Sequence, residues 1–254
     1  MGLKALRALA RSILKDAYHR SRDLSSFLRL DIPAGAIVDR SLHVENPQRI
    51  TIESGVSIGP DVKLICSPSG SIVLRAGATI ARGVVLVAED AGVIEIGSRA
   101  SVAPNVHMRT LSRITLGPES EVMESSSIEP REDASCGELV VGPRTTIHAY
   151  NWLDTTGSIR IGSDTHTGPF SMFYTHNHRF DKPGSIWDQG IRVADITLGD
   201  GIWMGSKTLV MPGAIVGNGA VIGAGSIVKG QFGSDELIVG APAASLRKRQ
   251  EGRR

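Results

Sequence analysis

Aromatic residues and cysteines are scarce in this chain of 254 residues. Phe, Trp and Tyr together make up only 4% of the sequence, which excludes a core built mainly from large rings. The two cysteines, Cys66 and Cys136, lie far apart and form no CxxC pair, so neither a disulfide framework nor a cysteine-rich metal site is expected. What remains is Ile, Val and Leu with 29 glycines, a composition typical of a narrow β-structured core with many tight turns.

The chain also lacks a long apolar run and a marked excess of charge of one sign. No stretch approaches the roughly 18 apolar residues of a membrane-spanning helix, so none is predicted. The formal net charge is only +2, which argues against nucleic acid as a partner. These features, with unpaired cysteines, predict a cytoplasmic protein.

Residues 1–32 are a separate segment, and their pattern predicts a basic amphipathic helix. Its apolar residues fall on one side of a helix and its basic residues on the other. Charges interrupt the apolar core that a secretory signal needs, at Lys4, Arg7, Arg11 and Lys15. The helix either packs on its own body or a partner subunit, or lies on the inner face of the cell membrane as a peripheral contact.

A six-residue period runs from Ile196 to Lys229. Six apolar residues recur in register, and four of them are followed by glycine: Leu198, Met204, Val210, Val216, Ile222 and Val228. An amphipathic helix repeats every three or four residues and a half-buried strand every two, so neither explains this period. The pattern predicts a parallel β-helix in which three six-residue steps make one coil.

The same period extends back through most of the chain. Six earlier positions correspond to Leu198, at spacings of 20 to 25 residues, except for a last gap of 37: Ile52, Leu74, Ile96, Leu116, Val141 and Ile161. Residues six and twelve positions after each of these seven are apolar at every one of the fourteen positions but Thr167. We therefore expect one β-helix domain over residues 33–232, with short insertions at one corner and an extruded loop at 174–195. Residues 233–254 are expected to leave the repeat and to end in a short basic helix.

Motifs in the second half of the chain resemble a known family. FYTHNHRFD, LGDGIWMG, MPGAIVG, IGAGSIV and VGAPA follow one another as in hexapeptide-repeat acyltransferases, in the branch of maltose, galactoside and cell-surface polysaccharide O-acetyltransferases. The resemblance covers roughly residues 50–247. It implies a left-handed, all-β parallel solenoid and a homotrimer. It further implies acetyl-CoA as co-substrate, no required metal, and a saccharide, such as a cell-surface polysaccharide precursor, as acetyl acceptor.

The resemblance places the catalytic histidine of the family on His178. His176 competes for this role because the HNH sequence puts two imidazoles two residues apart. A histidine suits a general base that takes the proton of an acceptor hydroxyl, since its ordinary pKa lies near neutrality. Neither cysteine lies in the loop and no GxSxG motif is present, so we expect direct transfer without a covalent intermediate.

Six residues are implied as acceptor-binding residues by the resemblance: Asn151, Thr175, Asp181, Asp188, Gln189 and Trp203. Asn151 is one residue short of the family spacing and is alternatively an ordinary corner asparagine. Asp188 and Gln189 compete for one acidic position, and Trp203 either lines the site or packs.

Coenzyme A contacts are implied for backbone groups of the coil turns and for nearby basic residues. These positions are Gly205, Ser206, Gly223, Ala224, Lys229, Gly240, Ala241, Pro242 and Arg247. Three departures weaken this part of the match, because Ala241 replaces the usual Asn, Ala244 replaces the usual Arg, and Lys229 is displaced by one residue.

Two other functions are compatible with such a solenoid. A zinc hydro-lyase of the carbonic-anhydrase kind needs three histidine ligands from neighbouring coils, whereas His176 and His178 are too close in sequence and lack a convincing third partner. A catalytically silent solenoid that serves as a scaffold or binding surface is the other alternative, because a fold alone does not imply activity.

Overall fold

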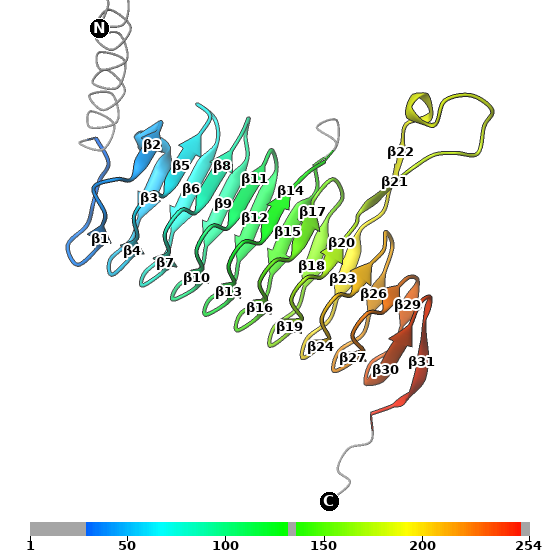
Figure 1. Ribbon diagram of the computed structural model, residues 1–254. Coiled ribbons are helices and arrows are strands. Elements are labelled where there is room, and N and C mark those ends of the chain that lie inside the picture. Colours follow the sequence, from blue (N-terminus) through cyan, green and yellow to red (C-terminus); the bar gives the residue numbers. More distant parts are fainter. Residues whose placement is uncertain (1–28, 132–135, 250–254) are drawn as a thin grey trace, which may run out of the picture.

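The chain winds into a parallel β-solenoid with three sheets along its length (Figure 1). The computed structural model describes residues 29–131 and 136–249. This confirms the predicted all-β parallel β-helix, while its left hand stays a prediction. Most of the predicted N-terminal helix, residues 1–28, lies outside the described residues. No helix in the described part of the chain has the length and apolarity needed to cross a lipid bilayer.

Each coil contributes one strand to each sheet, in the order A, B, C. Sheet A contains β1 (Ile37–Val38), β4 (Ser57–Ile58), β7 (Thr79–Ile80), β10 (Ser101–Val102), β13 (Glu121–Val122), β16 (Thr146–Ile147), β19 (His166–Thr167), β24 (Trp203–Met204), β27 (Val221–Ile222), β30 (Glu236–Gly240) and β31 (Ala243–Lys248). Sheet B contains β2 (His43–Glu45), β5 (Lys63–Cys66), β8 (Val85–Ala88), β11 (His107–Thr110), β14 (Ser127–Glu129), β17 (Trp152–Asp154), β20 (Met172–Phe173), β25 (Leu209–Val210) and β28 (Ile227–Val228). Sheet C contains β3 (Ile50–Ile52), β6 (Ser71–Leu74), β9 (Val93–Ile96), β12 (Arg113–Leu116), β15 (Glu138–Val141), β18 (Ile159–Ile161), β23 (Ile196–Leu198), β26 (Ile215–Val216) and β29 (Gln231–Phe232). A single 3-10 turn, η1 (Pro47–Arg49), lies between β2 and β3.

The strand register confirms the predicted six-residue period. Leu198 pairs with Ile161 in the preceding coil and with Val216 in the next, all in sheet C. Residues six positions further on stack in sheet A and those twelve positions further on stack in sheet B, as Ile80 on Ile58 and Leu86 on Leu64 illustrate. Parallel pairing in register stacks equivalent side chains, so the inward Ile, Val and Leu residues form one continuous buried column.

Thr167, the one polar residue at a predicted inward position, is buried with its hydroxyl satisfied. Its Oγ1 accepts a hydrogen bond from Asn151 Nδ2 at 2.6 Å and another from the backbone N–H of His148 at 3.1 Å. Asn151 Oδ1 in turn accepts from the backbone N–H of Ser171 at 2.7 Å. The exception in the pattern therefore marks a polar pair that links neighbouring coils.

The three corners of the coil differ in how much variation they contain. Every turn from sheet A to sheet B has four residues, such as residues 59–62 and 205–208. Connections from sheet B to sheet C vary from the two residues 111–112 to the segment 174–195. The insertions thus share one corner, and the predicted extruded loop is the largest of them (Figure 1).

The predicted C-terminal helix is wrong within the described residues. Ala243–Lys248 instead forms β31, which runs antiparallel to β30. The turn between them contains Gly240, whose φ of +103° suits glycine. Because β30 ends the stack of sheet A, its outer edge would expose unpaired backbone groups, and β31 covers that edge. β30 pairs with β27 in sheet A, which carries the solenoid beyond residue 232, to Gly240.

Candidate active site

A two-stranded ribbon projects from the corner between sheets B and C. Its strands are β21 (His176–His178) and β22 (Ile191–Val193), paired antiparallel, with the 3-10 turn η2 (Ile186–Gln189) near its tip. Two backbone hydrogen bonds extend the pairing, from Ala194 N to Thr175 O at 2.8 Å and from Arg179 N to Gly190 O at 2.9 Å. The histidines predicted from the sequence are therefore held on regular structure.

His176 is anchored to a buried carboxylate of the preceding coil. Its Nδ1 lies 2.7 Å from Asp154 Oδ2, and the Asp154 side chain is fully buried. The same carboxylate accepts hydrogen bonds from the backbone N–H and hydroxyl of Thr156 and from the backbone N–H of Thr175, at 2.6 to 3.2 Å. This network fixes the imidazole and connects the ribbon to the solenoid.

The pKa of Asp154 reflects two opposing influences. Burial alone would raise it, but hydrogen bonds from Thr156, His176 and the Thr175 backbone outweigh burial and hold the pKa below its ordinary value. Asp154 is therefore a carboxylate at neutral pH and accepts the proton on His176 Nδ1 as a hydrogen bond.

His178 lies on the same face of the ribbon, two residues along, but in different surroundings. Its ring stands edge-on to Trp187 of η2 at 4.9 Å between centroids, and to His176 at 5.8 Å. No carboxylate anchors it among the described residues. His178 instead contributes to a pocket lined by Asn177, His178, Arg179, Phe180, Asp181, Arg192 and Lys229.

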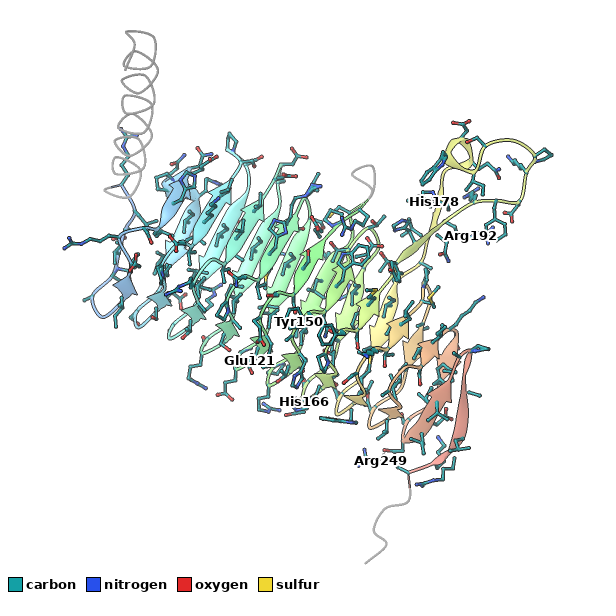
Figure 2. The ribbon with its side chains drawn as sticks, in the orientation of Figure 1. Glu121, Tyr150, His166, His178, Arg192 and Arg249 are labelled. Atoms are coloured by element: carbon teal, nitrogen blue, oxygen red, sulfur yellow. The ribbon has the colours of Figure 1, made fainter. Side chains whose placement is uncertain are left out.

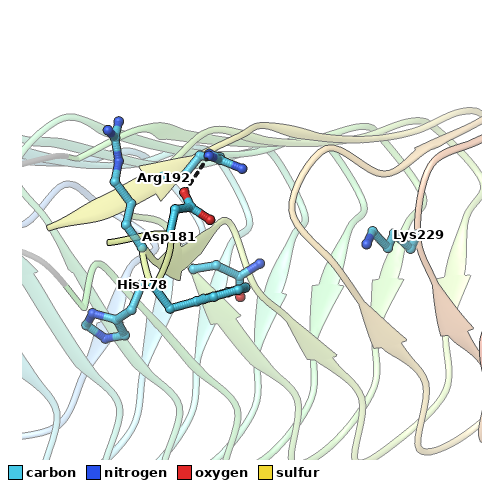
Figure 3. Close-up of a pocket in the computed structure, with 7 residues that line it drawn as sticks. His178, Asp181, Arg192 and Lys229 are labelled. Carbon is cyan, nitrogen blue, oxygen red and sulfur yellow. Dashed lines mark hydrogen bonds and ion pairs between the residues drawn. The ribbon is translucent and has the colours of Figure 1, made fainter. Parts of the chain in front are cut away.

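Six of the seven pocket residues come from the ribbon, and the seventh comes from the solenoid. Figure 3 shows Lys229, which follows β28, pointing across the pocket toward the ribbon, where Asp181 and Arg192 form an ion pair. That pair is 3.3 Å long and exposed. The pocket thus joins the candidate base to a group of cationic side chains.

Several known acetyltransferases are similar to this chain in sequence. No family model matches the chain. A probable acetyltransferase of Mycobacterium tuberculosis is 28% identical over 55% of this chain and 46% of that protein. A provisionally named lipopolysaccharide biosynthesis O-acetyl transferase of Escherichia coli is 28% identical over 44% of this chain and 61% of that protein. A chloramphenicol acetyltransferase of Escherichia coli is 40% identical over 40% of this chain and 41% of that protein. All three relatives are acetyltransferases by name, and each is similar to this chain over part of its length.

The relatives share only part of their length with this chain. The matched segments cover less than two thirds of each of the three proteins. The similarity to hexapeptide-repeat acyltransferases therefore rests on the six-residue solenoid together with these partial matches to acetyltransferases. The activity of the whole protein and its acceptor remain matters for proposal.

Three of the residues expected to bind acceptor are engaged with the protein itself. Asn151 and Thr175 are buried, and the Thr175 hydroxyl bonds to Asp154 O and to Gly157 N, each at 2.8 Å. Gln189 closes the ribbon tip through both backbone groups of Lys182, at 3.0 and 2.8 Å. These contacts favour positioning roles.

The other three expected acceptor-binding residues are accessible but dispersed. Asp181 lines the pocket, Asp188 lies in η2, and Trp203 is on the outer face of sheet A, 56% exposed and beside His166. The structure therefore does not place Trp203 with the ribbon.

The residues expected to bind coenzyme A divide between two corners. Gly205, Ser206, Gly223 and Ala224 lie in the turns from sheet A to sheet B, and the β30–β31 turn follows in line with them, as the register of β24, β27 and β30 shows. This strip, residues 205–206, 223–225 and 240–242, is open at Gly225, where an added methyl group would meet nothing within 4 Å. A row of small residues with accessible backbone fits an extended pantetheine arm. Lys229 lies instead at the corner that carries the ribbon, and Arg247 lies on β31.

Two aromatic residues lie at the same corner in the two coils that precede the strip. Tyr150 and Phe170 occupy equivalent corner positions in successive coils, with rings stacked at 4.9 Å and only 2° from parallel. Both have positive φ, +58° and +57°, which is unusual for large side chains. Figure 2 shows Tyr150 and His166 on the opposite side of the solenoid from His178 and Arg192.

Sequence reasoning missed Asp154 and Arg192. Trp152 and Leu153 pair with Met172 and Phe173, so Asp154 stands one coil before the start of the ribbon. The position of Asp154 one coil before the ribbon was the signal in the sequence that could have placed it near the histidines. In the described ranges, no three His, Cys, Asp or Glu side chains gather as a metal site would require.

Proposed function

We propose that this protein is an acyl-CoA-dependent O-acetyltransferase that moves an acetyl group from acetyl-CoA to a hydroxyl of a saccharide. The observation that carries the proposal is the ribbon, on which the His178 imidazole lies at a pocket with charged lining residues beside a hexapeptide solenoid. The acetyltransferase names of the relatives support the same class of reaction. A saccharide acceptor is supported by one relative, whose name assigns it to lipopolysaccharide biosynthesis.

His178 is the proposed general base. It accepts the proton of the acceptor hydroxyl as that oxygen bonds to the thioester carbonyl carbon. The tetrahedral intermediate then collapses, the carbon–sulfur bond breaks, and the departing thiolate takes the proton back from His178. Backbone N–H groups of the coil turns are suited to stabilise the intermediate oxyanion.

His176 is the alternative base, since the carboxylate of Asp154 orients it as in other catalytic pairs. Its side chain is only 12% exposed, however, which restricts the access of an acceptor to the ring. We therefore assign His176 a positioning role, in which it fixes β21 and the ring of His178 beside it.

A cysteine nucleophile is disfavoured for Cys66. Burial raises the pKa of Cys66 to about 11, so its thiol stays protonated at neutral pH. Direct transfer from coenzyme to acceptor is consequently the proposed route.

The complete site is proposed to form between two copies of the chain. The small-residue strip follows the corner between sheets A and B, whereas His178 lies at the corner between sheets B and C. The width of sheet B separates the two within one chain. A cyclic assembly, expected to be a homotrimer, would bring the ribbon of one copy to the strip of its neighbour.

The acceptor is the part of the proposal most in need of a direct test. Purified protein is mixed with acetyl-CoA and a panel of hydroxyl acceptors, and free thiol is followed over time. The panel includes neutral and acidic sugars, lipid-linked saccharides and chloramphenicol, because one relative is a chloramphenicol acetyltransferase. We expect thiol release with a saccharide. Failure with every acceptor and acyl-CoA would favour the silent scaffold instead.

A further inference from the structure

The pocket beside His178 carries an excess of positive charge. Arg179, Arg192 and Lys229 contribute three cations, and Asp181 contributes one carboxylate, so two positive charges remain. They come from both strands of the ribbon region and from the neighbouring coil, which converge only in the folded chain. A concave site with cations on several sides attracts anions more strongly than isolated surface charges do.

The protein anchors one of these cations and does not neutralise the group as a whole. Arg179 donates from Nε to Ile191 O at 3.1 Å, which fixes its stem and leaves its terminal nitrogens for a ligand. Arg192 pairs with Asp181 at 3.3 Å, but the two side chains are 71% and 60% exposed, so this pair is weak and exchangeable. Lys229 has no carboxylate partner in the part of the chain that is described.

Two substrates of the proposed reaction could bring an anion here: coenzyme A through its phosphates, or the acceptor. The pantetheine arm separates the thioester from the diphosphate by a long chain, and the thioester must reach His178 for transfer. An extended donor would therefore place its phosphates away from the cations that surround His178.

We infer that the acceptor carries a carboxylate or phosphate close to the hydroxyl that is acetylated. This inference rests on the proposed acetyltransferase function and specifies its substrate class as an acidic saccharide. Arginine binds such groups through paired hydrogen bonds, and Lys229 adds a point charge. The cations would thereby orient the acceptor hydroxyl toward His178.

A matched series of acceptors tests the inference kinetically. The rate of acetylation of methyl glucoside, methyl glucuronide and glucose 6-phosphate is measured with wild type, Arg192→Gln and Lys229→Met. Arg160→Gln is the control, because Arg160 is an exposed arginine of sheet C that pairs with Glu138. We expect each pocket variant to lower kcat/KM about tenfold for the acidic sugars, mainly through KM. The glucoside and acetyl-CoA should keep their KM values. An equal loss with the glucoside, or a raised KM for acetyl-CoA, would contradict the inference.

A binding measurement distinguishes this inference from failure of the proposed reaction. Trp187 contacts His178, so glucuronate and inorganic phosphate should change its fluorescence on binding. Trp187→Phe identifies the signal, and Arg192→Gln with Lys229→Met should abolish the saturable change. If glucuronate binds but no acceptor is acetylated, the proposed function fails while the anion site stands. If neutral sugars are acetylated and neither anion binds, the anion site fails while the proposed function stands.

Discussion

Two imidazoles on one short strand have different surroundings in this protein. His176 is almost enclosed and bonds to the buried carboxylate of Asp154, whereas His178 stands against Trp187 at the pocket. Alternation along β21 places both on one face, so the anchored ring supports the other. A residue identity alone does not separate these roles, but burial and hydrogen bonding do.

The carboxylate of Asp154 should stabilise the fold in a pH-dependent manner. Asp154→Asn is expected to lower the free energy of unfolding by about 3 kcal/mol at pH 7, because it breaks a buried charged network. The folded-state pKa of Asp154 is depressed, so its contribution is complete above the ordinary aspartate pKa and is lost as pH falls through the lower folded value. The unfolding free energies of wild type and variant should therefore begin to converge below about pH 4 and meet only below the folded-state pKa of Asp154.

A suitable control is Asp164→Asn, which removes an exposed ion pair with Arg144. This change should leave the free energy of unfolding nearly unchanged at pH 7, because solvent screens an exposed ion pair. A difference for Asp154→Asn that is small, or that grows on acidification, would contradict the assigned network.

The coils keep the same turn lengths at two corners and vary in length at the third. Turns from sheet A to sheet B keep four residues, so their glycines and left-handed residues stack in line, while all length changes occur between sheets B and C. Regular packing is thus preserved even where the ribbon departs from the solenoid. Residues with candidate chemistry accumulate at the corner that tolerates insertion.

Thr167 tests the polar link between coils. Thr167→Val replaces a hydroxyl with a methyl group of similar size, but leaves Asn151 Nδ2 without its acceptor. We expect a loss of about 1 to 3 kcal/mol in unfolding free energy, although the core becomes more apolar. Thr197→Val, on the exposed outer side of sheet C, is the control and should be nearly neutral. Stabilisation by Thr167→Val would show that the hydrogen bond is dispensable.

The ribbon is expected to be separable from the solenoid. Replacement of residues 174–195 by the four-residue sequence of 155–158, which makes the same connection one coil earlier, should preserve cooperative thermal unfolding and the β-type circular dichroism spectrum. Acetyl transfer should be abolished because His178 is removed. An unfolded product would mean that Thr175 and His176 are indispensable to the coils, and retained transfer would place the chemistry elsewhere.

At the scale of the whole molecule, the solenoid was predictable because its core needs one apolar residue in every six. Ile52 to Leu198 identified the coils, and the gap after Ile161 identified the ribbon. The β31 strand was not predictable, because its sequence AASLRK carries no strand pattern and pairs only to cover the edge of β30. Asp154 and Arg192 reach the site through coil register and ribbon pairing, which a linear motif does not display.

Assembly should restore activity to a mixture of two inactive variants. His178→Ala removes the proposed base, and Ser206→Trp obstructs the small-residue strip at the other corner. If each site combines the ribbon of one copy with the strip of the next, every hybrid trimer should contain one intact site of three, and an equal co-expressed mixture should keep roughly a quarter of the wild-type sites. Absence of recovery in hybrids verified by two affinity tags would place both parts of the site within one chain.

Transfer of acetyl groups under control of His178 is the central claim, and thiol release from acetyl-CoA in the presence of an acidic saccharide measures it most directly. Wild type should release thiol in step with acetylated sugar. His178→Ala should lower kcat by about two to four orders of magnitude with little change in the KM for acetyl-CoA, whereas His176→Ala should cause a smaller loss. Undiminished turnover by His178→Ala, with the protein folded, would contradict the account.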